Sequence, residues 1–440
     1  MIQSLKVYFN RRIAVITLMC FSAGVPLLLT GSTLAFWLRQ EGISYTAIGL
    51  AGLVHLPYAF KFVWSPLVDR MKLPFFTEHF GRRRGWLLFS QTILMLVLPV
   101  LGSMDPSHNL KSVIALSLVV AFASATQDTV ILAYQVERLG RSAFGAGEAS
   151  GVFGFRMGLL AGGAGALFLS TTLSWQVVYS LMSLLVGVGF VTTLLCAEPP
   201  VPPGREELCS ETQKGLGPWL KDAVVGPFRD FAKRQGWVYA LILMMTYKLG
   251  DNLIGSMSAL FYADVGYTAA EIASAVKVFG MWSSMLGGFI GGMLATRLSM
   301  LRALFWFALL HGLATFSYVY ISYIGYDLNA LYLTVAIEHI TGGMRLTALF
   351  VLQMSLCNPA YAATQMALFT SCVNLGRNTV SGFSGWLADQ LTWSQFFTVV
   401  SFSSLMPLFV ILLYHRKLNR SHTSLADTAP LMRPEQHASI

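Results

Sequence analysis

The sequence predicts an all-α polytopic membrane protein with 12 transmembrane helices, and three observations carry this prediction. Of the 440 residues, 55% are hydrophobic and 12% are charged, whereas a soluble chain has about 25% charged residues. The mean hydropathy is +0.60. The apolar residues also form many runs of the length that a bilayer-spanning helix needs, about 20 residues. These features exclude a soluble, a disordered and a disulfide-stapled secreted protein.

The apolar runs are the predicted spans. The first run follows Lys6, Arg11 and Arg12 and resembles a signal peptide, but it is too long and lacks a clear small-residue cleavage site, so we expect it to remain as the first span. The twelve runs are 13–38, 46–68, 86–103, 112–134, 149–173, 175–196, 237–261, 270–295, 303–323, 329–356, 361–387 and 395–414.

The basic residues predict the orientation in the membrane. An even number of spans places both termini on one face, and that face with its loops holds 22 of the 30 lysines and arginines. The opposite face holds Arg39 and Lys111, and the other six lie inside spans. The positive-inside rule therefore predicts cytoplasmic N- and C-termini. The net charge of +9 is explained by topology, so we expect the lipid bilayer and no nucleic acid as a partner.

One long polar interval divides the spans six plus six. Arg156 in the fifth span and Arg377 in the eleventh are six spans apart, which indicates two pseudo-symmetric six-helix bundles, the build of the major facilitator fold. The expected parts are an N-terminal bundle at 1–196, a cytoplasmic inter-bundle loop at 197–236, a C-terminal bundle at 237–414 and a disordered cytoplasmic tail at 415–440.

A charged motif lies between the second and third spans. Asp69 and Arg70 are followed by Arg82, Arg83 and Arg84, which resembles the facilitator signature D-R-x-G-R-R stretched by an insertion. An aspartate at one helix end that faces arginines on the next helix makes a gating latch, which can form and break as the bundles rock. The alternative is a loop whose charges only fix the topology.

Ionisable side chains inside spans are costly, and they usually mark functional sites. Six cations and three anions lie within the predicted spans, so we expect a basic cavity that binds a small anionic solute. The anions are Asp128, Asp251 and Glu338. Apart from Asp128, we expect these charges to be the substrate-binding residues: Lys61, Arg156, Lys248, Asp251, Lys277, Glu338, Arg345 and Arg377.

Some of these charges have a possible partner on the same helix. Lys248 and Asp251 are three residues apart on one helical face, so they either neutralise each other or contact substrate. Glu338 and Arg345 are seven residues apart and can be neighbours two turns away.

Asp128 has no cation three or four residues away. It needs a partner on another helix, or it is held protonated by desolvation. Either state suits a proton-coupling residue. The alternative is a static ion pair with Lys61 or Arg156.

Several kinds of site are absent from the sequence. There is no G-x-x-x-x-G-K-S/T phosphate loop, no H-E-x-x-H and no G-x-S-x-G. The cysteines are scattered, and Glu338-His339 has no second histidine at helical spacing. We therefore expect no enzymatic activity, no cofactor and no metal. A membrane transferase would need its reactive groups at the membrane interface, and a sensor would need an output domain.

The chain resembles the AmpG family of inner-membrane permeases, which import anhydro-muropeptides for cell-wall recycling. The resemblance implies a bacterial inner-membrane importer that works by alternating access, is driven by protons and is monomeric. The matching strings run in order to about residue 414: Phe21-Ser22-Ala23-Gly24-Val25-Pro26-Leu27, Phe60-Lys61-Phe62-Val63-Trp64-Ser65-Pro66, Gly81 to Trp86, Gln127-Asp128, Gly154-Phe155-Arg156, Tyr247 to Asp251, Gly342-Gly343-Met344, Ala363-Thr364-Gln365 and Gly376-Arg377.

Three departures from the family pattern leave a rival substrate open. Some family members have fourteen spans. The family often has a second carboxylate four residues after the position of Asp128, where this chain has Leu132, and a small residue follows Gly-Gly-Met where this chain has Arg345. Both changes make the cavity more basic, which favours a polyanion. A ferric siderophore of the polycarboxylate type is therefore the alternative substrate.

Overall fold

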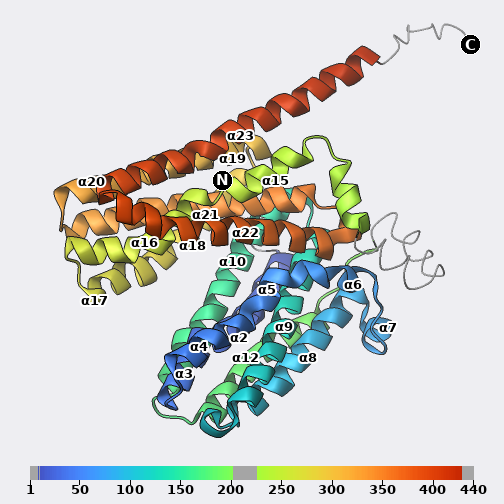
Figure 1. Cartoon of the computed structure of the whole chain (residues 1–440). Helices are drawn as coiled ribbons and strands as arrows, with labels where there is room; N and C mark the ends of the chain where they lie inside the picture. The colour runs from blue at the N-terminus through green and yellow to red at the C-terminus, as the bar shows by residue number, and fades with distance from the viewer. Residues whose placement is uncertain (1–7, 9, 202–224, 429–440) are drawn as a thin grey trace, which may run out of the picture.

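The computed structural model describes residues 8, 10–201 and 225–428, and within these it describes no side chains for residues 45, 256, 269, 375–383 and 418–428. The described residues form helices and no strands, so the all-α prediction is confirmed. Two groups of helices lie one above the other in Figure 1, one from each half of the chain. Contacts within each group, such as α2 with α10 and α18 with α21, far outnumber those between the groups.

The first half runs from α2 to α12. Its elements are α2 (Arg11–Leu29), α3 (Ser32–Gln40), α4 (Tyr45–Ala51), η1 (Gly52–His55), α5 (Leu56–Phe60), η2 (Lys61–Val63), α6 (Ser65–Arg70), α7 (Phe76–Phe80), α8 (Arg82–Gly102), α9 (Pro106–Arg138), η3 (Arg141–Ala143), α10 (Phe144–Leu160), η4 (Ala161–Gly165), α11 (Ala166–Leu169) and α12 (Trp175–Leu195).

The second half runs from α15 to α23. Its elements are α15 (Trp237–Thr246), α16 (Leu249–Val265), α17 (Ala269–Ile272), η6 (Ala273–Phe279), α18 (Gly280–Ala295), α19 (Met300–Ala314), α20 (Phe316–Ile324), α21 (Leu328–Leu356), η7 (Pro359–Tyr361), α22 (Ala362–Gln390) and α23 (Trp393–Thr428). Helix α23 continues to Thr428, past residue 414 where the sequence places the start of a disordered tail. Residues 429–440 lie outside the described part of the chain.

Among the residues that the structure describes, ten helical segments are long and apolar enough to cross a membrane. They correspond to ten of the twelve predicted spans. The other two predicted spans are the seventh, which is α15 and α16 in sequence, and the eleventh, which is α22. Tyr247 and Lys248 divide the seventh predicted span into two helices, and neither is long enough to cross a membrane alone.

Two predicted spans are broken helices. The second span consists of four short helical pieces and α6, and Lys61 begins the 3₁₀ piece η2. In the seventh span, Lys248 lies at the break before α16, with φ −109° and ψ 15°. In membrane proteins, irregular backbone is tolerated where it is buried in protein or lines a cavity. The two breaks therefore point to the place where the site lies.

Glycines bring helices into close contact within each half. A Cβ on Gly158 of α10 would lie 2.1 Å from the Phe21 carbonyl oxygen of α2, and a Cβ on Gly287 of α18 would lie 2.0 Å from the Ile340 oxygen of α21. Neither position has room for a side chain. These glycines therefore serve helix packing, as their GxxxG spacing indicates.

The two halves touch mainly near one end. The Tyr8 hydroxyl donates to the Phe289 oxygen at 3.0 Å, and Gly145 packs against Gly292. Figure 1 shows the two groups close together beside α6 and α22 and diverging toward the opposite side, where α3 and α4 face away from α17 and α20. We call the end that holds α6 the closed end and the opposite end the open end.

Candidate functional site

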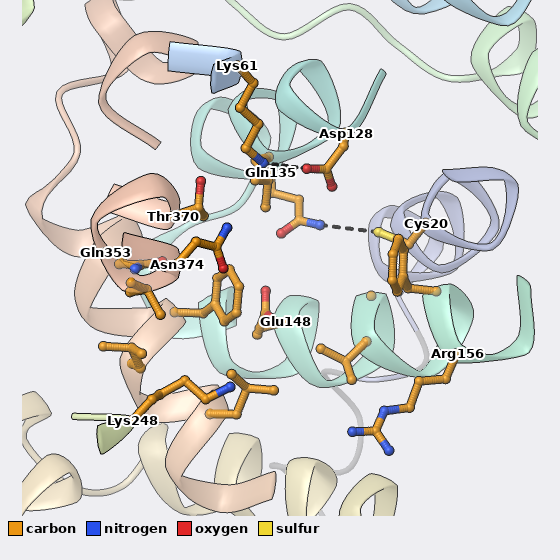
Figure 2. A pocket seen from close by; sticks show the side chains of 18 of the residues that line it. Cys20, Lys61, Asp128, Gln135, Glu148, Arg156, Lys248, Gln353, Thr370 and Asn374 are labelled. Atoms are coloured by element: carbon orange, nitrogen blue, oxygen red, sulfur yellow. Dashed lines mark hydrogen bonds and ion pairs between the residues drawn. The ribbon is translucent and has the colours of Figure 1, made fainter. Parts of the chain in front are cut away.

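A cavity of about 530 Å³ lies between the two halves. One face of α10 forms a wall, through Glu148, Val152, Phe155 and Leu159, which are spaced three or four residues apart. The remaining walls come from both halves: Cys20, Lys61, Asp128, Leu132, Gln135, Gly151, Arg156, Lys248, Leu346, Leu349, Phe350, Gln353, Thr370, Val373 and Asn374. Figure 2 shows these side chains converging from several helices.

Asp128 is ion-paired across helices. The Lys61 Nζ atom lies 2.5 Å from the Asp128 Oδ2 atom, so the partner is one of the two cations that the sequence left open. The Lys61 side chain is 6% exposed and that of Asp128 is 29% exposed. Because the aspartate is open to the cavity, a proton or a cation from the cavity can compete with Lys61 for it.

Two more cations face the cavity. The Arg156 guanidinium donates to the Ser284 hydroxyl at 3.0 Å and to the Met281 oxygen at 3.3 Å, both on α18 of the other half. Lys248 enters from the helix break of the seventh span, and it lies opposite Lys61 in Figure 2. The three cations thus surround the cavity from three directions, and they can hold anionic groups that are several ångströms apart.

Uncharged polar groups complete the lining. The Oε1 atoms of Gln135 and Gln353 are buried and accept no hydrogen bond within the described part of the chain. A buried acceptor without a donor costs roughly 1–3 kcal/mol. Both glutamines line the cavity, so rotation of either side-chain amide would turn its oxygen toward N–H or O–H groups of a ligand, and Phe155 and Phe350 offer apolar surface in the same lining.

Sequence reasoning missed Glu148, which also lines the cavity and is 4% exposed. The fifth span was predicted to begin at residue 149, so Glu148 was placed in a loop. In the structure α10 begins at Phe144, which puts Glu148 on the second turn of the helix. If residues 145, 147 and 151, which are glycines, had been counted as helical, the predicted fifth span would have included Glu148.

Asp251 and Arg345 form a separate cluster in the second half. Arg345 Nη1 lies 2.9 Å from Asp251 Oδ1, and His311 Nε2 lies 2.7 Å from the same oxygen. The predicted pair of Arg345 with Glu338 is therefore wrong. A spacing of seven residues places Glu338 and Arg345 on one face of α21. Arg345 nevertheless lies closer to Asp251 of α16 than to Glu338.

Of the other predicted binding residues, Glu338 and Lys277 do not line the cavity. Glu338 pairs with the neighbouring His339, whose Nδ1 atom lies 2.5 Å from Glu338 Oε2. Lys277 is exposed on the π-helical segment η6. Arg377 lies on α22, and its side chain is outside the described residues.

The predicted latch residues meet at the closed end. Arg83 Nη2 donates to Asp69 Oδ1 at 2.7 Å and to Glu137 Oε1 at 2.6 Å. Arg82 donates to the same glutamate at 2.8 Å. The side chains of Arg83, Asp69 and Glu137 are at most 2% exposed. We call these four residues the latch cluster; sequence reasoning missed Glu137, which lies at the end of α9, beyond the predicted fourth span.

Asp69 extends the latch cluster to the second half. Its Oδ2 atom accepts hydrogen bonds from the Thr364 hydroxyl at 2.7 Å and from the Thr364 backbone N–H at 2.8 Å, and its Oδ1 atom accepts from the Ala363 N–H at 3.2 Å. Thr364 lies at the start of α22, so the helix N-terminus also favours the carboxylate. One buried aspartate thus ties the two halves together.

The remaining basic residues of the motif serve other contacts. Arg84 donates to the carbonyl oxygens of Thr193 and Leu194 at 2.9 and 2.7 Å, which ties α8 to α12. Arg70 lies beside Gly226 of the inter-bundle loop. Two of the five predicted latch residues therefore lie next to the latch cluster and not in it.

The sequence matches a family model. The model described as Major Facilitator Superfamily matches residues 13–379. The Anhydromuropeptide permease of Escherichia coli K12 is 37% identical over 421 residues, which cover 94% of this chain and 82% of the relative. The Putative transporter AmpG 4 of Rickettsia conorii is 31% identical over 416 residues, which cover 94% of this chain and 99% of the relative.

Solved structures share the fold. The transporter FucP in the outward conformation superposes with a TM-score of 0.67 at 13% identity, covering 93% of this chain and 99% of FucP. The proton:xylose symporter XylE superposes with a TM-score of 0.65 at 11% identity, covering 91% of this chain and 94% of XylE. At such identities the likeness concerns the fold alone.

Proposed function

The chain belongs to the major facilitator superfamily and, within it, to the AmpG-like permeases, and from this premise we propose that it imports anhydromuropeptides by proton-coupled alternating access. It is a membrane permease and not an enzyme. The observation that carries the substrate proposal is the cavity, where three cations stand around unsatisfied amide acceptors and aromatic faces.

The cavity chemistry suits a sugar linked to a short peptide. Carboxylates of such a solute can pair with Arg156 and Lys248, and its amide N–H and hydroxyl groups can donate to Gln135 and Gln353. The sugar ring can pack on Phe155 and Phe350. The cations, the amides and the aromatic rings of the lining each then have a role that a muropeptide fills.

Asp128 is the proposed proton-coupling residue. Its ion pair with Lys61 lies at the cavity wall, so protonation of Asp128 releases Lys61 to bind an anionic substrate. The reverse also holds, because a substrate carboxylate that binds Lys61 favours protonation of Asp128. Proton and substrate therefore load together in this scheme.

The latch cluster is the proposed gate. The bundles 1–196 and 237–414 are the units that rock, and the cluster holds them together at the closed end through Asp69 and Thr364. With cytoplasmic termini, as the positive-inside rule predicts, the closed end is cytoplasmic and the structure is the outward-open state. Opening toward the cytoplasm then requires the hydrogen bonds of Asp69 to α22 to break.

The case for a ferric siderophore loses its two supports in the structure. Arg345 is buried against Asp251 and does not line the cavity. The family carboxyl group that is missing at Leu132 has a counterpart in Glu148, a carboxyl group in the same cavity. Without Arg345, the cavity has fewer cations than the sequence indicated, and the muropeptide remains as the proposed substrate.

The proposed location is the bacterial inner membrane, with both termini cytoplasmic, and the proposed working unit is one chain, whose two halves together line the cavity. Reporter fusions test the orientation. A reporter after Arg416 should give a cytoplasmic signal and one after Asp105 a periplasmic signal. The opposite pattern would overturn the outward-open assignment.

Uptake into proteoliposomes tests the function. Wild-type protein should accumulate labelled anhydromuropeptide under a pH gradient that is acidic outside, and a ferric citrate chelate should not compete. Loss of a charge-assisted hydrogen bond costs about 1.5–3 kcal/mol, so Lys248→Gln should raise the half-saturating concentration about tenfold or more. Lys277→Gln is the matched control and should leave it within about twofold. Equal effects of the two lysines, or accumulation of the chelate alone, would refute the proposal.

A further inference from the structure

Glu148 is a carboxylate in the cavity wall that the scheme above does not use. It is 4% exposed, and within the described part of the chain it forms no hydrogen bond or ion pair. Figure 2 shows its carboxylate pointing into the cavity, below the dashed contacts of Lys61 with Asp128 and of Gln135 with Cys20. A buried carboxylate without a cation costs several kcal/mol when it is ionised, so this position favours the neutral acid.

The surrounding charges give Glu148 no cation in contact. Helix α2 presents Cys20 to it, and α9 presents Asp128, whose negative charge repels an ionised Glu148. Helices α21 and α22 present Leu349, Phe350, Gln353, Thr370 and Asn374 to the cavity, none of which is charged. The cations of the lining pair elsewhere or lie along other walls: Lys61, Arg156 and Lys248. Arg377 follows Asn374 by three residues on α22, and its side chain is outside the described set.

The distance of Glu148 from the closed end bears on whether it can take part in proton transfer. Asp128 lies ten residues before the end of α9 at Arg138, and Glu148 lies four residues after the start of α10 at Phe144. At 1.5 Å per residue these are about 15 Å and about 6 Å from helix ends on the closed side. Glu148 therefore lies between the Lys61–Asp128 pair and the closed end.

We propose that Glu148 is a second proton-binding residue of the transport cycle, which holds a proton in the outward-open state while the Lys61–Asp128 ion pair is intact. This rests on the proposed proton-coupled function. In the outward-open state, a proton from cavity water forms an O–H bond on the Glu148 carboxylate. When the closed end opens, that O–H bond breaks and the proton passes to water on the cytoplasmic side. The carboxyl group that other family members have at the position of Leu132 thus has a counterpart on the next helix.

Glu148→Gln tests this role in proteoliposomes. Two assays are compared for each variant: accumulation of labelled anhydromuropeptide under a pH gradient, and exchange of labelled for unlabelled solute without a gradient. Glu148→Gln should lower accumulation at least tenfold while exchange remains measurable. Glu148→Asp, which keeps the carboxylate, should accumulate solute with a shifted pH profile. Gln135→Ala, which changes a polar residue of the cavity lining on α9, should weaken both assays alike and is the matched control.

The outcomes separate the two proposals. If the wild type accumulates solute and Glu148→Gln does so equally well with the same pH profile, Glu148 carries no proton and the transport function stands. If Glu148→Gln loses both assays, Glu148→Asp decides: accumulation with a shifted pH profile supports the proposal, and loss of both assays refutes it in favour of a packing or ligand contact. If the wild type neither accumulates nor exchanges the muropeptide, the proposed function itself fails.

Discussion

The latch cluster and the Lys61–Asp128 pair are both ion pairs, but water reaches them differently. In the latch cluster, Arg83 and Glu137 are fully buried and Asp69 is 2% exposed. In the cavity pair, the aspartate is 29% exposed and has one cationic partner. A buried, several-membered cluster is strongly destabilised when one member is removed, because the others remain charged and desolvated. A pair beside water loses little, so it can open and close during transport.

The latch cluster and the Lys61–Asp128 pair also differ in which helices they join. The Lys61–Asp128 pair connects two helices of the same half. The latch cluster connects three helices of the first half to the start of α22 in the second. Breaking the first pair leaves the bundles in place, whereas breaking the second frees one bundle from the other. Stability and conformational state are therefore expected to depend on the latch cluster, and ligand and proton binding on the pair.

Removal of Arg83 should have the largest effect on stability. Arg83→Met leaves Asp69 and Glu137 buried, with Arg82 as the remaining nearby cation, so we expect a loss of about 3–5 kcal/mol. The measurements are the yield of folded protein in the membrane and the apparent melting temperature in detergent. Lys61→Met is the matched control, and it should change both quantities much less. A melting temperature that falls equally for the two variants would contradict the distinction between buried and water-facing pairs.

Removal of Arg345 should have an intermediate effect. Arg345 is 1% exposed, but its partner Asp251 is 21% exposed, so water can partly solvate the stranded aspartate of Arg345→Met. We expect a loss of about 2–3 kcal/mol, below the range for a fully buried pair. The double change with Asp251→Asn should recover part of the melting temperature, and the double change with Glu338→Gln should not. Recovery by Glu338→Gln alone would show that Glu338 is the partner of Arg345 after all.

The sequence predicted the helices and much of the latch because these depend on local composition. Apolar runs of spanning length and the positive-inside rule need no knowledge of distant contacts. Asp69 and Arg83 were found because the motif joins adjacent helices across a short loop. Within a helix, the break at Lys248 was not predicted, since its neighbours are as apolar as those of a continuous span.

Most pairings between helices far apart in the sequence could not be predicted from the sequence. The Asp251–Arg345–His311 cluster joins three helices through residues far apart in sequence, and spacing along one helix suggested the wrong partner for Arg345. Asp128 was left with two possible cations, and the structure selects Lys61. Glu148 was missed because the predicted fifth span began one residue too late, although its glycine-rich surroundings allow α10 to begin at Phe144.

Removal of the Asp128 charge should have the smallest effect on stability and a decisive effect on transport. In Asp128→Asn, the amide oxygen of the asparagine can still accept a hydrogen bond from Lys61, which is 6% exposed, so we expect a cost of about 1 kcal/mol. The melting temperature should therefore stay close to that of the wild type. Accumulation of labelled muropeptide under a pH gradient should be lost, because the variant cannot bind a proton at this position. Exchange should persist, and Lys61 should bind the anionic solute with equal or higher affinity, since Asp128 no longer competes for it.

Lys61→Met is again the control: it should weaken solute binding in both assays. A well-folded Asp128→Asn protein with normal gradient-driven accumulation would show that the pair has no part in coupling, whereas an unfolded one would show that the pair is static.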